Sequence, residues 1–264
     1  MPMIKWVLKK WKSYKYRFVP WLIFNFKNRS MQKELKTQQD CILHHELAVD
    51  SVFEVLTLLN ENISPFETQY VQHEKANQLL LRRLGFEVRR QRSAVPAAGR
   101  GVVVTRGVVP AGAVCAWYPG TVYLPGDPLL LASIGNQFVF ACADGVHVDG
   151  RGGGLSGLLF GSCAGRDHMG PYPAADRSWR TELPANPLAV GQFVNNQSPG
   201  FPSNVRYQEV DLPAVPYPLR RYLPYAWYRA RVPPPMRAVV LVAQRDIRAG
   251  EELFANYFTV VHDS

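Results

Sequence analysis

Residues 46–85 carry an apolar pattern with the period of an α-helix. Val52, Phe53, Leu56 and Leu59 recur at steps of three and four residues, which places them on one side of a helix. The polar residues between them then face the other side. We therefore predict an amphipathic helix that packs its apolar side on the rest of the chain.

A second helix is predicted after the first, and its ends carry local signals. Ser64 suits the N-cap, Pro65 suits the first helical position, and Glu67 would complete a capping box with Ser64. Gly85 suits the left-handed residue that commonly follows a helix. The predicted apolar side consists of Phe66, Tyr70, Leu80 and Leu84. Residues 41–90 are therefore expected to form a helical hairpin.

Beyond the hairpin, the pattern changes to short apolar runs separated by Gly, Pro, Asn and Asp. The runs are Val102–Val104, Val108–Val109, Val114–Trp117, Phe138–Cys142, Val146–Val148, Phe193–Val194, Val205–Tyr207, Ala238–Val242 and Leu253–Phe254. Many short strands joined by turns predict a compact, folded-over β domain over residues 91–264. The predicted fold class is therefore mainly β with an N-terminal helical part.

Two loop insertions are expected within this β domain. Residues 150–190 contain GRGGGLSG and then PYPAAD, which predicts a segment with little regular structure. The glycine run lacks the GKS/T ending of a phosphate-binding loop and no helix clearly follows it, so we interpret it as a flexible insertion. Residues 211–236 hold seven prolines and several aromatic residues, which predicts a second insertion or rim loop.

The net charge of +9 is concentrated at the N-terminus. Residues 1–33 hold nine of the 30 Lys and Arg residues and no acid, so the other 21 balance the 21 Asp and Glu residues. The β domain therefore offers no charge argument for a direct nucleic-acid site. The basic segment, residues 1–40, is instead expected to be an ordered or surface-binding helix that contacts an acidic partner or a membrane surface.

The four cysteines, Cys41, Cys115, Cys142 and Cys163, form no CxxC pair and no cluster with His, so no zinc site is expected. No secretory signal is evident, which favours reduced thiols in an intracellular protein of the nucleus or cytoplasm. The basic, acid-free N-terminus is also typical of mitochondrial leaders, which leaves the mitochondrion as the alternative. The apolar run at 18–26 is shorter than the roughly 20 residues that span a bilayer.

Four segments contain candidate chemistry, although each has a plain structural interpretation. The first segment is plainly interpreted as two strands joined by a turn at Pro110–Gly112, although the two glycines at 99 and 101 would also let the backbone approach a ligand closely. The Pro-Gly pair at 119–120 suits a type II turn. Asn195 and Asn196 follow a predicted strand, where adjacent asparagines commonly form a turn. At 250–257, a glycine turn leads into an edge strand, in which Tyr257 could be a core aromatic residue.

Taken in order, the four segments resemble the SET-domain family of protein lysine methyltransferases. The family pattern is a GxG turn, a Y-x-G strand end, an N-H-S-C loop and a GEEL…Y ending. This chain has GRGVVV, YPG, FVNNQS and DI-x-x-GEELFANY, and the resemblance covers roughly residues 95–260 apart from the two insertions. It implies a SET-type β-clip with a pseudoknot, in which the last strand threads beneath the asparagine loop.

The resemblance also implies S-adenosyl-L-methionine as cofactor and a lysine of a protein or peptide as substrate. The Gly99, Arg100 and Gly101 turn would lie against the methionine and ribose part of the cofactor. Asn195 and Asn196 would hold its adenine and amino-acid ends. Tyr257 would point at the methyl sulfonium as an aligner, because its pKa of about 10 is too close to the lysine pKa of about 10.4 for a strong base.

The sequence also departs from the family pattern. Asn196 replaces the family's histidine, Ser198 replaces a zinc-ligating cysteine, and Ala255 stands where Phe or Tyr is common. Seven residues follow Tyr257 in this sequence, so no cysteine-rich tail is expected to close the lysine channel. These departures motivate an alternative, a SET-fold binding module that recognises a protein partner without turnover. A further alternative is a SAF-like β-clip protein without methyl chemistry, whose AG-x-V hairpins resemble Ala111–Val114.

Overall fold

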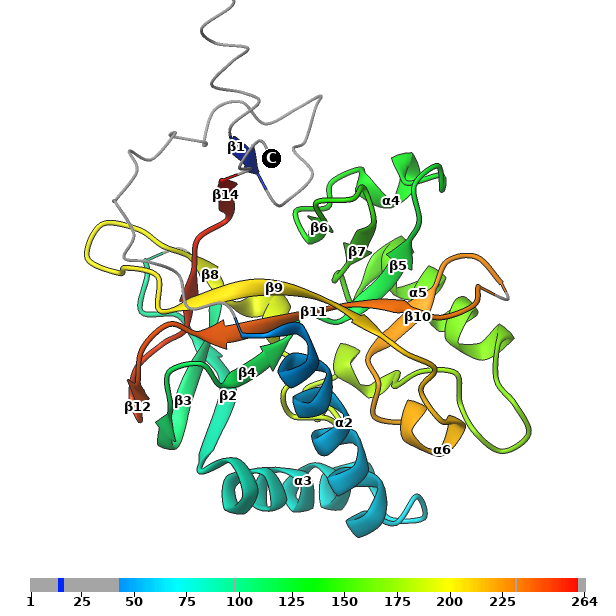
Figure 1. Cartoon of the computed structure of the whole chain (residues 1–264), viewed down its shortest axis with the longest axis horizontal. Coiled ribbons are helices and arrows are strands. Elements are labelled where there is room, and N and C mark those ends of the chain that lie inside the picture. The colour runs from blue at the N-terminus through cyan, green and yellow to red at the C-terminus, as the bar shows by residue number, and fades with distance from the viewer. Residues whose placement is uncertain (1–13, 17–42, 97, 231, 261–264) are drawn as a thin grey trace, which may run out of the picture.

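The computed structural model describes residues 14–16, 43–96, 98–230 and 232–260, and within them it is mainly β with helices toward the N-terminus (Figure 1). The predicted fold class is therefore confirmed. Most of the basic segment 1–40 lies outside the described residues. Its residues Tyr14–Tyr16 form strand β1, so the helix that we expected there is wrong for these three positions.

The helical hairpin is present, with α2 at His45–Asn62 and α3 at Gln69–Leu84. The start predicted for the second helix is wrong. Thr68, not Ser64, caps α3, and its hydroxyl accepts a hydrogen bond from the backbone N–H of Val71 at 3.4 Å. Residues 64–67 form a turn outside the helix, so Phe66 is 94% exposed instead of packing on the core.

The strands after the hairpin form three further sheets besides the β1–β14 pair. They are β2 (Phe86–Arg92), β3 (Arg100–Val109), β4 (Val114–Trp117), β5 (Gly120–Tyr123), β6 (Val139–Ala141), β7 (His147–Asp149), β8 (Asn195–Asn196), β9 (Val205–Leu212), β10 (Tyr225–Trp227), β11 (Met236–Ala243), β12 (Ile247–Arg248), β13 (Phe254–Ala255) and β14 (Phe258–Val260). The sheet orders are β12-β3-β2, β4-β11-β9-β13-β8 and β10-β5-β7-β6. Short strands thus fold over one another in several small sheets.

Two predicted strand assignments need correction. The runs 102–104 and 108–109 belong to the single strand β3, whose partner β2 carries the polar sequence RRQR and was not predicted as a strand. Val194 follows a 3₁₀ turn at Gly191–Phe193 instead of ending a strand. In both places, tertiary pairing decides the structure where the apolar pattern alone is ambiguous.

Both insertions contain more regular structure than expected. A helix, α5 (Gly154–Arg166), begins within the glycine run, where no helix was expected. Phe160 on this helix packs edge-on against Trp179, with ring centroids 5.1 Å apart, and so holds α5 against the rest of the chain. In the second insertion, β10 pairs in parallel with β5 and so extends a sheet. Two short helices complete the insertions, α4 (Leu130–Ser133) and α6 (Tyr217–Arg220).

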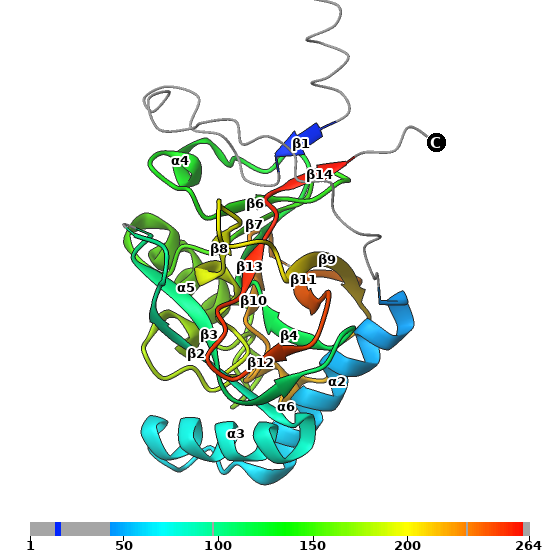
Figure 2. The same cartoon turned by 90° about the vertical axis from the view of Figure 1, so that its left-hand side faces the viewer.

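The C-terminal part of the chain forms the crossing that the resemblance implied. Strand β13 lies between β8 and β9, which are consecutive in the chain and joined by residues 197–204 (Figure 2). The backbone N–H groups of Gln197 and Asn204 donate to Ala255 and Phe254 from either end of this connection. The segment before Tyr257 therefore runs beneath the connection.

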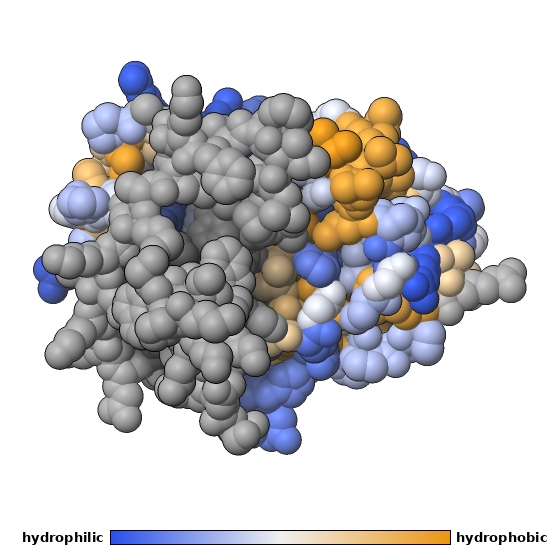
Figure 3. Space-filling model, turned by 90° about the horizontal axis from the view of Figure 1, so that it is seen from above, coloured by the Kyte–Doolittle hydropathy of each residue, from blue (hydrophilic) through white to orange (hydrophobic). Residues whose placement is uncertain are grey.

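One end of the molecule carries an apolar surface over α4 (Figure 3). Leu130, Leu131 and Ile134 are all exposed there. The helix α4 thus presents its leucines outward and only Ala132 inward. Among the described residues, no helix combines the length and the apolar character needed to span a bilayer.

Candidate functional site

Three of the four segments singled out in the sequence meet at the crossing. The N–H of Leu253 donates to the carbonyl of Val102 at 2.7 Å, which places the last part of the chain along β3 just after Gly101. On its other side, β13 pairs with β8, with Phe254 opposite Asn195 and Ala255 opposite Asn196. The structure therefore brings residues 99–101, 195–196 and 257 into one place.

Asn195 connects all three segments through its side-chain amide. Its Nδ2 donates to the backbone carbonyl of Arg100 at 3.0 Å and to Oε1 of Glu252 at 3.1 Å. A turn-forming asparagine would bond to its own local backbone instead. Asn195 thus holds the glycine turn against the C-terminal segment.

Glu252 is a central residue of this site that the sequence analysis did not single out. Its carboxylate is buried, and it accepts from Ser93 Oγ at 2.8 Å and from the backbone N–H of Ala94 at 2.8 Å as well as from Asn195. The neighbouring Glu251 faces outward and pairs with Arg245. Two-residue alternation along the GEEL sequence was the available signal, since adjacent side chains of a strand face opposite ways.

The two glycines of the turn are needed for different reasons. A Cβ at Gly101 would lie 1.9 Å from Oε1 of Glu252, so only glycine leaves room for the buried carboxylate. Gly99 has φ +76° and open space around it, so its requirement is conformational. The spacing GxG therefore combines a left-handed turn with one close approach.

Arg100 takes part in the site through its backbone and not through its guanidinium. Its carbonyl accepts from Asn195, whereas its exposed side chain donates to both carboxylate oxygens of Glu182 at 2.7 and 3.0 Å. Hydrogen bonds from Arg100, and then from Arg90, lower the pKa of Glu182. The Arg100 side chain is therefore already paired with Glu182 at the exposed edge of the site.

Residues 194–196 hold Tyr257 through both its backbone and its side chain. Its backbone N–H donates to Oδ1 of Asn196 at 3.0 Å, and its hydroxyl donates to the carbonyl of Val194 at 2.7 Å. Asn196, which replaces the family's histidine, thus keeps a hydrogen bond to the tyrosine segment. The phenol proton is therefore directed at the carbonyl of Val194.

An aromatic cluster that the sequence did not reveal adjoins Tyr257 through Tyr207. The ring of Tyr207 lies 6.2 Å from that of Tyr257, 6.0 Å from Tyr118 and 5.0 Å from Phe140. Tyr118 and Phe140 complete the cluster at 5.5 Å from one another. The four residues come from different strands and loops, so only the folded chain brings them together.

The pKa of Tyr118 is raised well above its usual value, mainly by burial and then by the neighbouring Tyr257 and Asp149. Its hydroxyl donates to the carbonyl of Phe138 at 2.8 Å. Tyr118 therefore stays protonated at neutral pH and acts as a hydrogen-bond donor. The sequence pattern indicated Tyr118 only as the first residue of the YPG segment.

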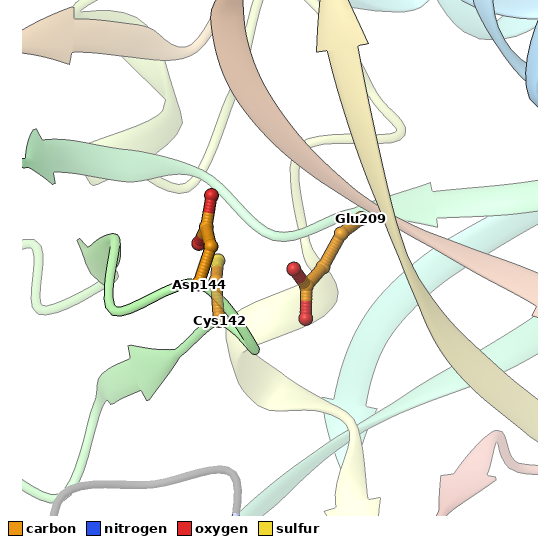
Figure 4. A group of neighbouring side chains, drawn as sticks. All are labelled: Cys142, Asp144 and Glu209. Carbon is orange, nitrogen blue, oxygen red and sulfur yellow. The ribbon is translucent and has the colours of Figure 1, made fainter. Parts of the chain in front are cut away.

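Cys142, Asp144 and Glu209 bring three potential metal-ligand atoms within 4.8 Å of one another (Figure 4). Arg237 neutralises this group, because it donates to Asp144 at 2.8 Å and to Glu209 at 2.9 Å. Burial raises the pKa of the Cys142 thiol to about 12, so the sulfur remains protonated. The cluster is an ion-pair network around an arginine.

Comparisons with known proteins identify close relatives of the whole chain. It is 39% identical over 294 aligned positions to SET domain-containing protein 9 of Homo sapiens, covering 98% of both chains. It is 46% identical over 211 positions to SET domain-containing protein 9 of Pongo abelii, covering 79% of this chain and 77% of the relative. No family model matches the chain.

Solved structures with a similar arrangement are more distant. A Polycomb repressive complex 2 chain in an autoinhibited conformation bound to S-adenosylmethionine matches 65% of this chain and 15% of its own length, with 14% identity and a TM-score of 0.36. KRYPTONITE, in complex with mCHH DNA, an H3(1-15) peptide and SAH, matches 65% of this chain and 23% of its own length, with 18% identity and a TM-score of 0.35.

Proposed function

The chain belongs to the SET domain-containing protein family, and from this premise we propose that it is an S-adenosylmethionine-dependent methyltransferase whose acceptor is a lysine of a protein or peptide. The two relatives confirm the family resemblance that the motifs indicated. The observation that carries the proposal is the convergence of the GxG turn, Asn195, Asn196 and Tyr257 at the crossing.

The asparagine pair has chemistry that fits the nucleoside of this cofactor. Asn195 uses its Nδ2 and Asn196 uses its Oδ1 in hydrogen bonds within the site. One acceptor, Asn195 Oδ1, and one donor, Asn196 Nδ2, have no hydrogen bond to any described residue. An adenine edge offers both a donor and an acceptor, so it would suit either of these amide groups. Because adjacent residues of a strand face opposite ways, the two amides would contact different parts of the cofactor.

When bound, the cofactor supplies an electrophilic methyl group on a positively charged sulfur. Tyr257 then positions the reacting groups: its proton is held by Val194, so its oxygen can accept weak C–H hydrogen bonds. It need not remove a proton from lysine. Holding two reactants in line is sufficient for a large part of the rate.

The aromatic cluster provides the surroundings that the lysine needs. A free lysine has a pKa of about 10.4 and must lose a proton before it can attack. Low-polarity surroundings lower a lysine pKa, because they disfavour the charged form. Tyr207 would offer such surroundings beside Tyr257, with Tyr118 and Phe140 packed against Tyr207.

The proposal is tested by separating cofactor binding from transfer. Calorimetry with S-adenosylmethionine should show saturable binding to the wild type and weaker binding to Asn195→Ala, which loses both hydrogen bonds of the amide. Transfer from labelled cofactor to a library of lysine peptides should fall about 10- to 100-fold in Tyr257→Phe, because the aligning oxygen is lost. Tyr70→Phe, at an exposed position on α3, is the matched control.

Each outcome distinguishes the proposal from its alternatives. Cofactor binding without transfer to any peptide would favour a binding module that recognises a protein partner. Absence of cofactor binding would favour a β-clip protein without methyl chemistry. Transfer that Tyr257→Phe and Tyr70→Phe leave equal would remove Tyr257 from the mechanism.

A further inference from the structure

Strand β1 comes from the basic N-terminal segment but pairs with the far end of the chain. Tyr14, Lys15 and Tyr16 are antiparallel partners of Val260, Thr259 and Phe258 in β14. Figures 1 and 2 both show β1 beside β14, apart from the larger sheets. Because β14 begins directly after Tyr257, this pairing reaches the residue next to the candidate site.

The pairing is the single strand contact of β14 among the described residues. The sheet contains only β1 and β14, whereas β13, just before Tyr257, lies between β8 and β9. Tyr257 is thus anchored on its N-terminal side by the crossing and on its C-terminal side by β1. A three-residue strand has no stable extended structure without a partner.

We infer that β1 is a positioning element of the site: it orders the backbone that follows Tyr257 and so keeps the phenol at the reacting centre. This inference rests on the proposed methyl transfer. In this chain, the strand that flanks Tyr257 is therefore completed by an N-terminal segment more than 240 residues away in sequence.

The strand pairing can be tested with engineered cysteines. Lys15→Cys with Thr259→Cys places the two residues opposite one another, where antiparallel Cα atoms are about 4.5–5.5 Å apart and a disulfide is geometrically allowed. Lys15→Cys with Phe258→Cys is the matched control, because Phe258 is one residue out of register with Lys15. Both pairs also carry Cys41→Ser, so that this native thiol does not compete for the engineered cysteines. Mild oxidation should link the first pair and not the second.

The functional consequence is tested by weakening the ladder. Tyr14→Pro/Lys15→Pro removes two successive N–H groups, one of which must point at β14, and Tyr14→Ala/Lys15→Ala is the control. In the proline variant, hydrogen exchange over residues 254–260 should accelerate and methyl transfer should fall about 10- to 100-fold. Cofactor affinity and the melting temperature should match those of the alanine variant.

The outcomes separate this inference from the proposed function. If the wild type transfers no methyl group, crosslinking and hydrogen exchange still decide whether β1 orders the segment after Tyr257. If transfer is robust but the proline and alanine variants behave alike, the positioning role is wrong while the proposed function stands. Equal crosslinking of the matched and offset cysteine pairs would also overturn it. The crosslinked protein, assayed before and after reduction, gives a readout that does not depend on the proline variant folding.

Discussion

Two regions of the molecule both bury polar groups, but they differ in how those groups are hydrogen-bonded. We call residues 93–104, 194–204 and 250–257 the crossing, and β5, β7, β10, α5 and residues 174–181 the α5 layer. In the crossing, both carboxylate oxygens of Glu252 accept hydrogen bonds, and both side-chain polar atoms of Asn204 are engaged. In the α5 layer, Asp149 and Asp176 each bury one oxygen that has no partner among the described residues.

The two regions also differ in how far away along the sequence the hydrogen-bond partners lie. Glu252 bonds to Ser93, 159 positions earlier, and to Asn195, 57 positions earlier. Asp176 bonds to Ser178, two positions away. Buried atoms without a partner among the described residues occur in the α5 layer on Thr121, Tyr123, Asp149, Asp176, Trp179 and Arg180.

The comparison shows in which region buried polar groups determine how the chain is arranged. In the crossing, fully bonded polar groups join segments that lie far apart in the chain, which makes the arrangement specific. In the α5 layer, packing around Phe160 and Trp179 forms a small separate core, and the polar groups contribute less. We expect mutations in the crossing to be costly and some polar-to-apolar changes in the α5 layer to be neutral or stabilising.

The largest expected effect concerns the space between Gly101 and Glu252. Gly101→Ala should lower the free energy of unfolding by about 3–5 kcal/mol, because its methyl group displaces a buried carboxylate and breaks several hydrogen bonds. Gly99→Ala, which has open space but a positive φ, should cost only about 1 kcal/mol. Urea denaturation measures both. Equal costs would mean that Glu252 moves away freely.

The second prediction concerns Asp176 in the α5 layer. Burial raises its pKa to about 6, whereas an aspartate in an unfolded chain has a pKa of about 3.9. The folded protein therefore binds the proton more tightly, so this residue lowers the free energy of unfolding progressively as pH rises from about 4 to about 6. Asp176→Asn should remove that dependence and stabilise the protein by about 1–2 kcal/mol at pH 7.

Denaturation of wild type and Asp176→Asn across pH 4–8 checks this sign. Glu182→Gln is the opposing control at the rim of the crossing, because Arg100 and Arg90 lower the pKa of Glu182. That carboxylate contributes stability above its unfolded pKa and loses it as pH falls, but it is exposed and its effect should be small. A wild-type curve parallel to that of Asp176→Asn would show that Asp176 is not buried as described.

The smallest effect separates two buried tyrosines of the four-stranded sheet. The hydroxyl of Tyr225 donates to the carbonyl of Val239 at 3.0 Å and accepts from its N–H at 3.2 Å, so Tyr225→Phe should cost about 1 kcal/mol. The hydroxyl of Tyr123 has no partner among the described residues, so Tyr123→Phe should change stability by less than about 0.5 kcal/mol. Thermal denaturation of the two variants decides the comparison. A larger loss in Tyr123→Phe would reveal a hydrogen bond that the structure does not contain.

The sequence alone determined the elements and motifs whose signals are local. The helical period from Val52 to Leu59, the C-terminal Gly85 and most of the short strands follow from residue spacing and backbone preference. The order of the GxG, YPG, Asn-Asn and GEEL…Y segments was sufficient to indicate the family. That pattern also indicated the crossing, although only by resemblance.

Tertiary structure decided what depends on partners from elsewhere in the chain. Strand β2, helix α5 and strand β10 are stabilised by neighbours that no local pattern specifies. The burial of Glu252, the aromatic cluster beside Tyr257 and the pairing of β1 with β14 likewise join residues from distant segments. Side-chain period and turn preference act over a few residues, whereas burial and hydrogen bonding depend on which segments meet once the chain has folded.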